Sequence, residues 1–231
     1  MVAGRHRIGA NSKVGCVLDI DFKKIGQNHE QSFMSHDVYG HSCAITGAVW
    51  NLDGREFDGI GGYIDCGNPT ILNITGSITL EVNAKVDKIN PADIQSVVGK
   101  YNSAVTDQMS WLLSNPTNAA LVEFLISQDG NNGEGVSSST GLVVGKWHHL
   151  TGVYNASSLL MSVFKDGVQN SETTTYTSLK ITPQNVLIGA QGAAAGGTRR
   201  FLDGHISRAK VYNYADYTAK VLQRAINSKN H

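Results

Sequence analysis

Strict alternation of apolar and polar side chains over residues 76–86 is the feature that most limits what this chain can fold into. The apolar residues of the alternation are Ile78, Leu80, Val82, Ala84 and Val86, and the polar residues between them are Thr79, Glu81, Asn83 and Lys85. Successive side chains of a strand point to opposite faces of a sheet, whereas a helix repeats every 3.6 residues. The pattern therefore predicts a half-buried antiparallel strand.

Several other runs in the sequence are short and strand-like. They span 14–22, 95–101, 109–114, 120–127, 146–154, 158–165 and 205–212. Clusters of Gly, Asn, Asp and Ser separate these runs, and Asp166-Gly167 between two of them is the signal of a two-residue hairpin turn. Together they predict an all-β fold, an antiparallel two-sheet jelly-roll sandwich.

The two ends of the chain depart from this strand pattern. Residues 1–13 are basic and polar, and residues 215–228 carry apolar side chains at helical spacing around the helix-capping residue Asp216. No composition shift or internal repeat divides the rest of the sequence. We expect a basic N-terminal arm over 1–13 and a single jelly-roll domain over 14–231, which includes a short C-terminal helix at 215–228.

Charge and hydropathy exclude several classes of function. The 231 residues include 19 Lys+Arg and 19 Asp+Glu, so the chain has no excess charge to hold a nucleic-acid backbone or an anionic membrane. No apolar stretch is long enough to span a bilayer, and no apolar run follows the basic start as it does in a secretory signal. Three irregularly spaced cysteines, Cys16, Cys43 and Cys66, match no metal or redox motif and are expected to be buried.

An ordered series of segments resembles a known family. The segments are FDGIGGYIDCGN, LNITGSITLEVNAKV, VVGKYN, GKWHHLTGVYN, LLMSVFKDGVQ, VLIGA and FLDGHISRAKVYNYA. Their order and spacing, from about residue 14 to residue 227, are similar to the laminin-G-like branch of the concanavalin A-like lectin/glucanase superfamily. The resemblance implies a two-sheet jelly roll with loops at its rim, a fold that hosts lectins, glycosidases, lyases, adhesion modules and virion parts.

Glycosidases of this fold use two carboxylates at alternating positions of one strand. In 76–86 the polar face carries only Glu81, with Thr79 and Asn83 two positions away. The Arg, Gln-x-His and Tyr set of the polysaccharide lyases of this fold is not found in the sequence either. We therefore expect a protein that is not an enzyme, with polysaccharide degradation as the remote alternative.

Asp19 and Asp21 are the one acidic pair that a predicted strand places on a single face. They are candidate metal ligands or a catalytic pair, and the alternative is a solvated face balanced by the two lysines that follow. The resemblance implies a calcium site, but this chain has Gly62 before its aromatic residue and Ser207 in its last strand, where the family commonly has acids. Calcium needs several oxygen ligands, so we expect no cofactor, with Ca²⁺ at Asp19 and Asp21 as the alternative.

Two polar loops, 127–141 and 189–200, carry most of the remaining candidate ligand-binding residues. These are Asp129, Asn131, Asn132 and Glu134 in the first loop and Arg199 and Arg200 in the second. The first set has groups that bind a sugar or an ion, although the same composition is typical of a hairpin tip. The arginines suit an acidic sugar or a neighbouring subunit, against the alternative of a mobile rim loop.

The aromatic residues complete the set of candidates. Trp111 is a candidate for stacking on a sugar ring, and its alternative is packing between the sheets. Trp50 and Trp147 are expected in the core. His148 and His149 are adjacent in a predicted strand and point to opposite faces, so we expect one of them packed and the other exposed.

These observations favour a non-catalytic structural or binding module. We expect a virion accessory or decoration protein of a bacteriophage capsid or tail, which forms a homo-oligomer or binds other virion proteins and contacts cell-surface glycans. Such a protein is made in the cytoplasm without a signal peptide and lies on the virion surface, which reconciles a surface fold with the missing export signal. The alternative is a stand-alone lectin-like carbohydrate-binding module, cytoplasmic or extracellular.

Overall fold

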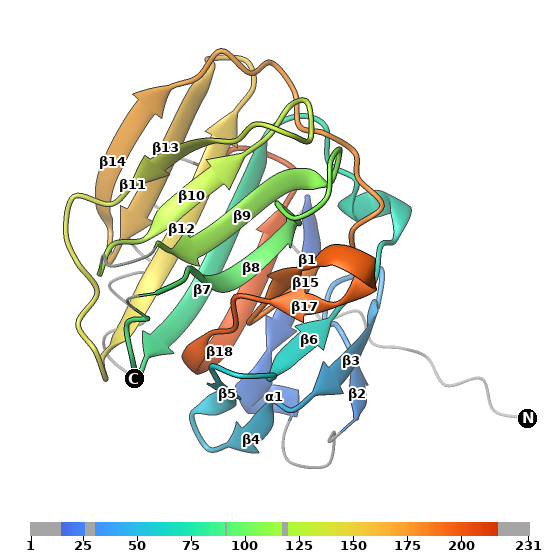
Figure 1. Cartoon of the computed structure of the whole chain (residues 1–231), viewed down its shortest axis with the longest axis vertical. Helices are drawn as coiled ribbons and strands as arrows, with labels where there is room; N and C mark the ends of the chain where they lie inside the picture. Colours follow the sequence, from blue (N-terminus) through green and yellow to red (C-terminus); the bar gives the residue numbers. More distant parts are fainter. Residues whose placement is uncertain (1–14, 26–30, 91, 117–119, 217–231) are drawn as a thin grey trace, which may run out of the picture.

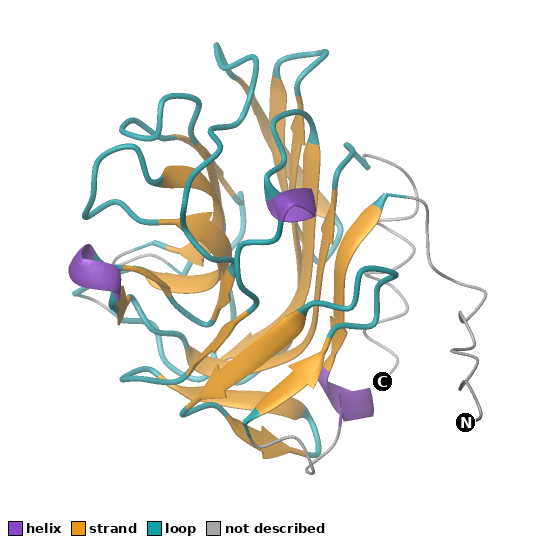
Figure 2. Cartoon of the chain, turned by 90° about the vertical axis from the view of Figure 1, so that its right-hand side faces the viewer, coloured by secondary structure: helices purple, strands orange, loops and turns teal. Residues whose placement is uncertain are grey.

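Two antiparallel sheets pack face to face in the computed structural model of the chain (Figure 1). The structure describes residues 15–25, 31–90, 92–116 and 120–216. Seen after a 90° turn, the sheets form two layers, with loops projecting from the outside of one of them (Figure 2). This architecture confirms the predicted two-sheet jelly-roll sandwich.

The first sheet has eight strands, in the order β14-β13-β12-β7-β18-β5-β4, with β1 paired to β18. Their bounds are β14 Val168–Thr173, β13 Leu160–Lys165, β12 Trp147–Asn155, β7 Ile78–Val86, β18 Asp203–Tyr212, β5 Gly54–Asp58, β4 Val49–Asn51 and β1 Cys16–Asp21. The strand predicted at 76–86 is β7, in the middle of this sheet. The hairpin predicted at Asp166-Gly167 joins β13 to β14, and both turn residues have the positive φ, 53° and 84°, that such a turn requires.

The second sheet also has eight strands, in the order β11-β10-β9-β8-β15-β6-β3-β2. Their bounds are β11 Glu134–Ser137, β10 Glu123–Ile126, β9 Met109–Asn115, β8 Gln95–Tyr101, β15 Leu187–Ile188, β6 Tyr63–Asp65, β3 Ser42–Thr46 and β2 Ser32–Met34. The smaller elements are the strand pair β16 Gln191–Gly192 and β17 Thr198–Arg199, the helix α1 Phe22–Ile25, and the 3-10 turns η1 Thr70–Leu72 and η2 Ala194–Gly196.

The core lies between the two sheets and is built from the inward faces that the alternation predicts. The expectation of a half-buried strand at 76–86 is wrong, however, because Thr79 and Glu81 on the polar face are only 0% and 7% exposed. Glu81 is satisfied by neighbouring strands: its carboxylate contacts His149 at 3.0 Å and Tyr212 at 3.3 Å. The polar face of β7 is thus buried at Thr79 and Glu81 and half-buried at Asn83 and Lys85, a difference that alternation along one strand does not reveal.

The tryptophan and histidine expectations are also corrected. Trp50 and Trp147 are half-buried rather than in the core. Trp147 opens β12 beside Lys85, whose ammonium lies 5.9 Å from the indole centroid. His148 and His149 are both buried, since each faces a carboxylate on its own side of the sheet; His148 pairs with Asp166 at 2.7 Å.

The strands β11 and β14 are the edge strands of their sheets and lie at the same end of the sandwich (Figure 1). The side-chain amide of Asn170 on β14 donates a 2.7 Å hydrogen bond to the carbonyl of Ser137 on β11. A side chain thus bridges the two edges, in addition to the core contacts between the sheets.

The remaining expectations concern the two ends of the chain, the cysteines and membrane-spanning segments. The N-terminal arm at 1–13 and most of the helix at 215–228 lie outside the described residues. Cys16, Cys43 and Cys66 are buried free thiols, as expected. No helix in the described part of the chain is long and apolar enough to cross a membrane.

Candidate functional site

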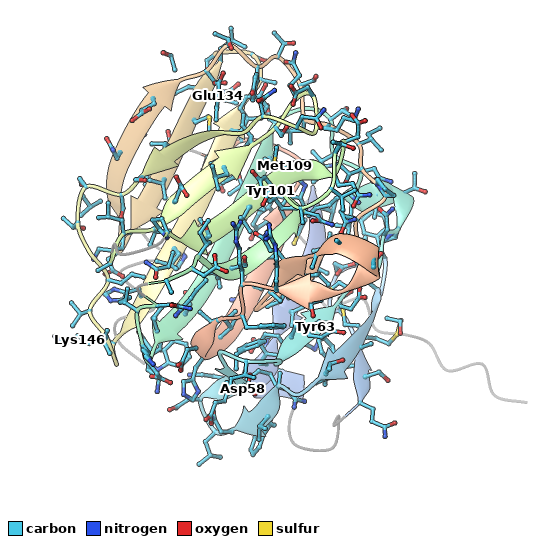
Figure 3. The ribbon with its side chains drawn as sticks, in the orientation of Figure 1. Asp58, Tyr63, Tyr101, Met109, Glu134 and Lys146 are labelled. Atoms are coloured by element: carbon cyan, nitrogen blue, oxygen red, sulfur yellow. The ribbon has the colours of Figure 1, made fainter. Side chains whose placement is uncertain are left out.

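The outer face of the second sheet carries a small apolar cluster that is separate from the core. Tyr101, Met109 and Leu112 are buried in this cluster, and Leu125 packs against them. Figure 3 shows Tyr101 and Met109 side by side near the middle of this face, where they are register partners. Burial raises the pKa of Tyr101 to about 12, so its phenol keeps its proton even in alkaline solution. The cluster is therefore a small second core on this side of the sheet, and each of its three buried residues is at most 7% exposed.

The loop that joins β8 to β9, residues 102–108, brings the two predicted loops together. The backbone amide of Asp107 donates a 2.9 Å hydrogen bond to the side-chain oxygen of Asn131. At the other end of the same loop, the hydroxyl oxygen of Ser103 accepts a 2.7 Å hydrogen bond from Arg199. Loops that are far apart in the sequence therefore share one rim.

The arginine pair is the most strongly charged part of this rim. The guanidinium of Arg200 donates to Asp93 at 3.0 Å, to Ser103 at 3.1 Å and to the side-chain oxygen of Gln191 at 3.4 Å. Arg199 makes no ion pair with any described residue, and its Nε is buried without a hydrogen-bond partner there. Burial lowers the pKa of Arg199, and the neighbouring Arg200 lowers it further. The pair thus has more positive charge than its one carboxylate balances.

The predicted loop 127–141 is held together by its own polar side chains. One carboxylate oxygen of Asp129 accepts from the backbone amides of Asn131 and Asn132, each at 2.8 Å, and the other accepts from the Asn132 side chain at 2.7 Å. These hydrogen bonds hold the pKa of Asp129 well below its usual range. The three residues organise a hairpin tip, which is the alternative that the sequence left open.

Glu134 is not part of the rim but faces the edge of the sandwich between β11 and β14. Its carboxylate accepts hydrogen bonds from the hydroxyls of Thr174 and Thr175, the latter at 2.9 Å. A pocket of about 370 Å³ opens there; it is lined by Glu134, Gly135, Met161, Glu172, Thr173, Thr174 and Thr175. In Figure 3 Glu134 lies at the far end of the molecule from Asp58. Glu134 thus bonds to the segment that follows β14, whereas the side chain of Asp129 bonds within its own hairpin tip.

Trp111 lies in the core, with 0% of its surface exposed. It alternates on β9 with Leu112, which points to the outer face, so its indole points between the sheets. This is the packing alternative, and in this position the ring does not reach a ligand on the surface.

Asp19 and Asp21 are on β1, and each lies beside basic side chains of another element. Asp19 contacts Lys210 at 2.8 Å and Arg208 at 3.7 Å, and Asp21 contacts Lys24 at 3.3 Å. This is the charge-balanced alternative, although Asp19 is balanced by the adjacent strand β18 rather than by the lysines that follow it. In the described ranges no three His, Cys, Asp or Glu side chains gather as a metal site would require.

Sequence reasoning missed Ser103, Gln191 and Asp93, which complete the arginine pair. Ser103 lies in an ordinary polar turn, and Gln191 is buried in the short strand β16. The one available signal was the adjacency of Arg199 and Arg200 in a glycine-rich loop, which fixes a charge but not its partners. Gln191 lies in the same loop as the arginines, but Ser103 and Asp93 come from two other segments of the chain and depend on the sheet topology.

Comparisons with known proteins agree with this architecture. A family model described as the concanavalin A-like lectin/glucanases superfamily, Laminin_G_3, matches residues 58–221. No curated protein sequence gives a significant match.

Three of the solved structures with a similar fold are described in turn. The binding domain of botulinum neurotoxin DC in complex with SialylT has a TM-score of 0.65 at 11% identity, over 93% of this chain and 51% of that one. A structure titled for the dependence of botulinum neurotoxin type C cell entry on two ganglioside molecules has a TM-score of 0.68 at 12% identity, over 95% and 52%. The carbohydrate-binding module CBM40 of the Ruminococcus gnavus IT-sialidase, bound to α2,3-sialyllactose, has a TM-score of 0.57 at 17% identity, over 67% and 84%. The chain spans about half the length of the neurotoxin binding domains it matches, and at these identities the likeness shows the fold alone.

Proposed function

Because the chain belongs to the concanavalin A-like lectin/glucanases superfamily, we propose that it is a non-catalytic glycan-binding module. The ligand lies on the outer face of the second sheet, on the side where the buried cluster of Tyr101, Met109 and Leu112 packs. The polar rim formed by loops 102–108, 127–133 and 189–200 contacts its hydroxyl groups.

The observation that carries this proposal is the shared rim. One short loop contacts both predicted ligand loops, through Asp107 to Asn131 and through Ser103 to Arg199. A sugar presents a periphery of hydroxyls, so its site needs convergent hydrogen-bond donors and acceptors such as those of this rim. The likeness to a carbohydrate-binding module and to receptor-binding domains supports the same class of ligand. The virion role expected from the sequence gains no support from these matches.

A glycan array tests the proposal directly. The purified chain is labelled and applied with and without calcium, and each bound glycan is titrated into ¹⁵N-labelled protein. We expect binding to shift the backbone amide resonances of Ser103, Asn131 and Gly133. The amides of Asp19 and Asp21, which lie on the other sheet, are the internal control and are expected not to move.

Two results contradict the proposal. A folded protein that binds no glycan on the array rules out the function. Binding that shifts the resonances of β1 and leaves the rim loops unmoved rules out this site.

A further inference from the structure

Two guanidinium groups converge on one hydroxyl oxygen at the rim. Ser103 Oγ accepts from Arg199 at 2.7 Å and from Arg200 at 3.1 Å. A neutral hydroxyl is a weaker acceptor for a guanidinium than an oxyanion is, because charge on both partners shortens and strengthens the hydrogen bond. Ser103 is exposed on a turn, so an incoming group has access to the same donors.

The charge around this oxygen is unbalanced. Asp93 contacts Arg200 at 3.0 Å but forms no ion pair with Arg199. Arg199 is half-buried, and its Nε is buried without a hydrogen-bond partner among the described residues; a buried donor left unsatisfied is costly. The remaining neighbour, Gln191, already accepts from Arg200 at 3.4 Å and from Ser96 at 3.4 Å.

We propose that the Arg199–Ser103–Arg200 cluster binds an oxyanion carried by a sugar, either a carboxylate or a sulfate ester. The planar forks of two arginines match the oxygens of such a group, and its charge offsets the cation that Asp93 leaves unpaired. The hydroxyls of the sugar then contact the polar rim of loops 102–108 and 127–133. This inference rests on the proposed glycan-binding function and names the class of glycan.

The test is an array printed with acidic glycans beside their neutral parents, followed by calorimetry with the best pair; sialyllactose, sulfated lactose and lactose form one such set. We expect the wild-type chain to prefer the acidic member by about tenfold, a typical value for one charge-assisted contact. Arg199→Gln and Arg200→Gln are expected to bring that ratio close to one. Lys146→Gln, which removes the same charge from an exposed residue before β12, is expected to leave the ratio unchanged.

A second variant separates recognition from folding. Ser103→Ala keeps both arginines and removes the hydroxyl that the oxyanion replaces, so we expect acidic-glycan affinity within about threefold of wild type. A large loss of acidic-glycan affinity in this variant contradicts the proposal that the oxyanion takes the place of the Ser103 hydroxyl. Comparison of the sialylated and sulfated probes identifies which oxyanion the cluster prefers.

The outcomes also distinguish the inference from the proposed function. Neutral glycans bound as tightly as their acidic forms leave the glycan-binding function in place and overturn the oxyanion assignment. No glycan bound at all overturns both. Inorganic sulfate that competes as well as an acidic glycan at equal concentration overturns the sugar part, because the cluster is then a plain anion site.

Discussion

The imidazole Nε2 of His149 lies 3.0 Å from the carboxylate of Glu81, across the pairing of β12 with β7, and both side chains are buried. Tyr212 on β18 contacts the other oxygen of the same carboxylate at 3.3 Å. A buried carboxylate is costly to desolvate unless such donors surround it. Glu81 therefore ties the central strand of the first sheet to both of its neighbours.

Replacing Glu81 with leucine removes the acceptor that His149 and Tyr212 share. We expect Glu81→Leu to lower the free energy of unfolding by about 2–4 kcal/mol, because His149 and Tyr212 lose the buried carboxylate that both of them contact. Urea denaturation measures this loss. The matched control is Glu172→Leu on the exposed edge strand, expected to change stability by less than about 0.5 kcal/mol. Equal midpoints for the two variants contradict the structural role of Glu81.

Lys100 predicts a pH dependence of stability. Its side chain is 0% exposed, its ammonium donates to Asn68 and to the carbonyl of Gln184, and burial lowers its pKa from 10.5 to about 8. Between these two values the unfolded chain holds a proton that the folded chain has released, so stability rises with pH. The full gain is up to about 3 kcal/mol.

The measurement is urea unfolding of wild type and Lys100→Met at about pH 7, 9 and 10. Other titrating groups contribute to both proteins, so the difference between them isolates Lys100. We expect the free energy of unfolding of wild type to rise relative to that of the variant as the pH rises. A difference that stays constant with pH is the contrary result, and Lys146→Met, at an exposed position, supplies the baseline.

Gly189 and Gly145 form a matched pair for a steric prediction. Both have positive φ, 80° and 76°, but a Cβ at Gly189 meets the ring of Phe57, whereas one at Gly145 has open space. Gly145→Ala therefore costs only the backbone strain, about 1 kcal/mol. We expect Gly189→Ala to lose about 1–3 kcal/mol more from overpacking, measured as midpoint shifts in urea. Similar losses for both contradict the close approach of Phe57.

Calcium is expected to leave the thermal stability of the chain unchanged. Asp19 is already neutralised by Lys210 at 2.8 Å, and a cation there has to displace that ammonium. Thermal unfolding in millimolar calcium and in EDTA is expected to agree within about 1 °C. A clear rise of Tm in calcium indicates a bound ion, since a ligand that binds the folded state stabilises it.

Local sequence patterns were sufficient to predict the strands, but not to predict which of their side chains are buried. Alternation along 76–86 and the turn signal at Asp166-Gly167 gave β7 and the β13–β14 hairpin, because both depend on neighbours in sequence. The burial of Glu81 and the positions of the tryptophans depend on which segment covers a face. Trp111 and Trp147 both occupy apolar strand settings, yet the first is in the core and the second is half-buried at the start of β12.

The candidate site was predictable to the same extent. Arg199 and Arg200 were recognisable as a charged pair, and the structure places them on the rim. Ser103 and Asp93 come from the segments that flank β8, and they reach the arginines only once the chain has folded. Such partners are set by strand order, which a single sequence does not state.

The bridge from Asn170 to Ser137 has a consequence for how copies of this protein behave at high concentration. Edge strands carry unpaired backbone groups that recruit strands from other molecules. Here one amide side chain occupies a carbonyl on β11, and the exposed side of β14 presents Gln169, Glu172 and other polar groups. The polar and charged side chains on β14 and the occupied carbonyl on β11 disfavour pairing of this edge with a strand of another molecule.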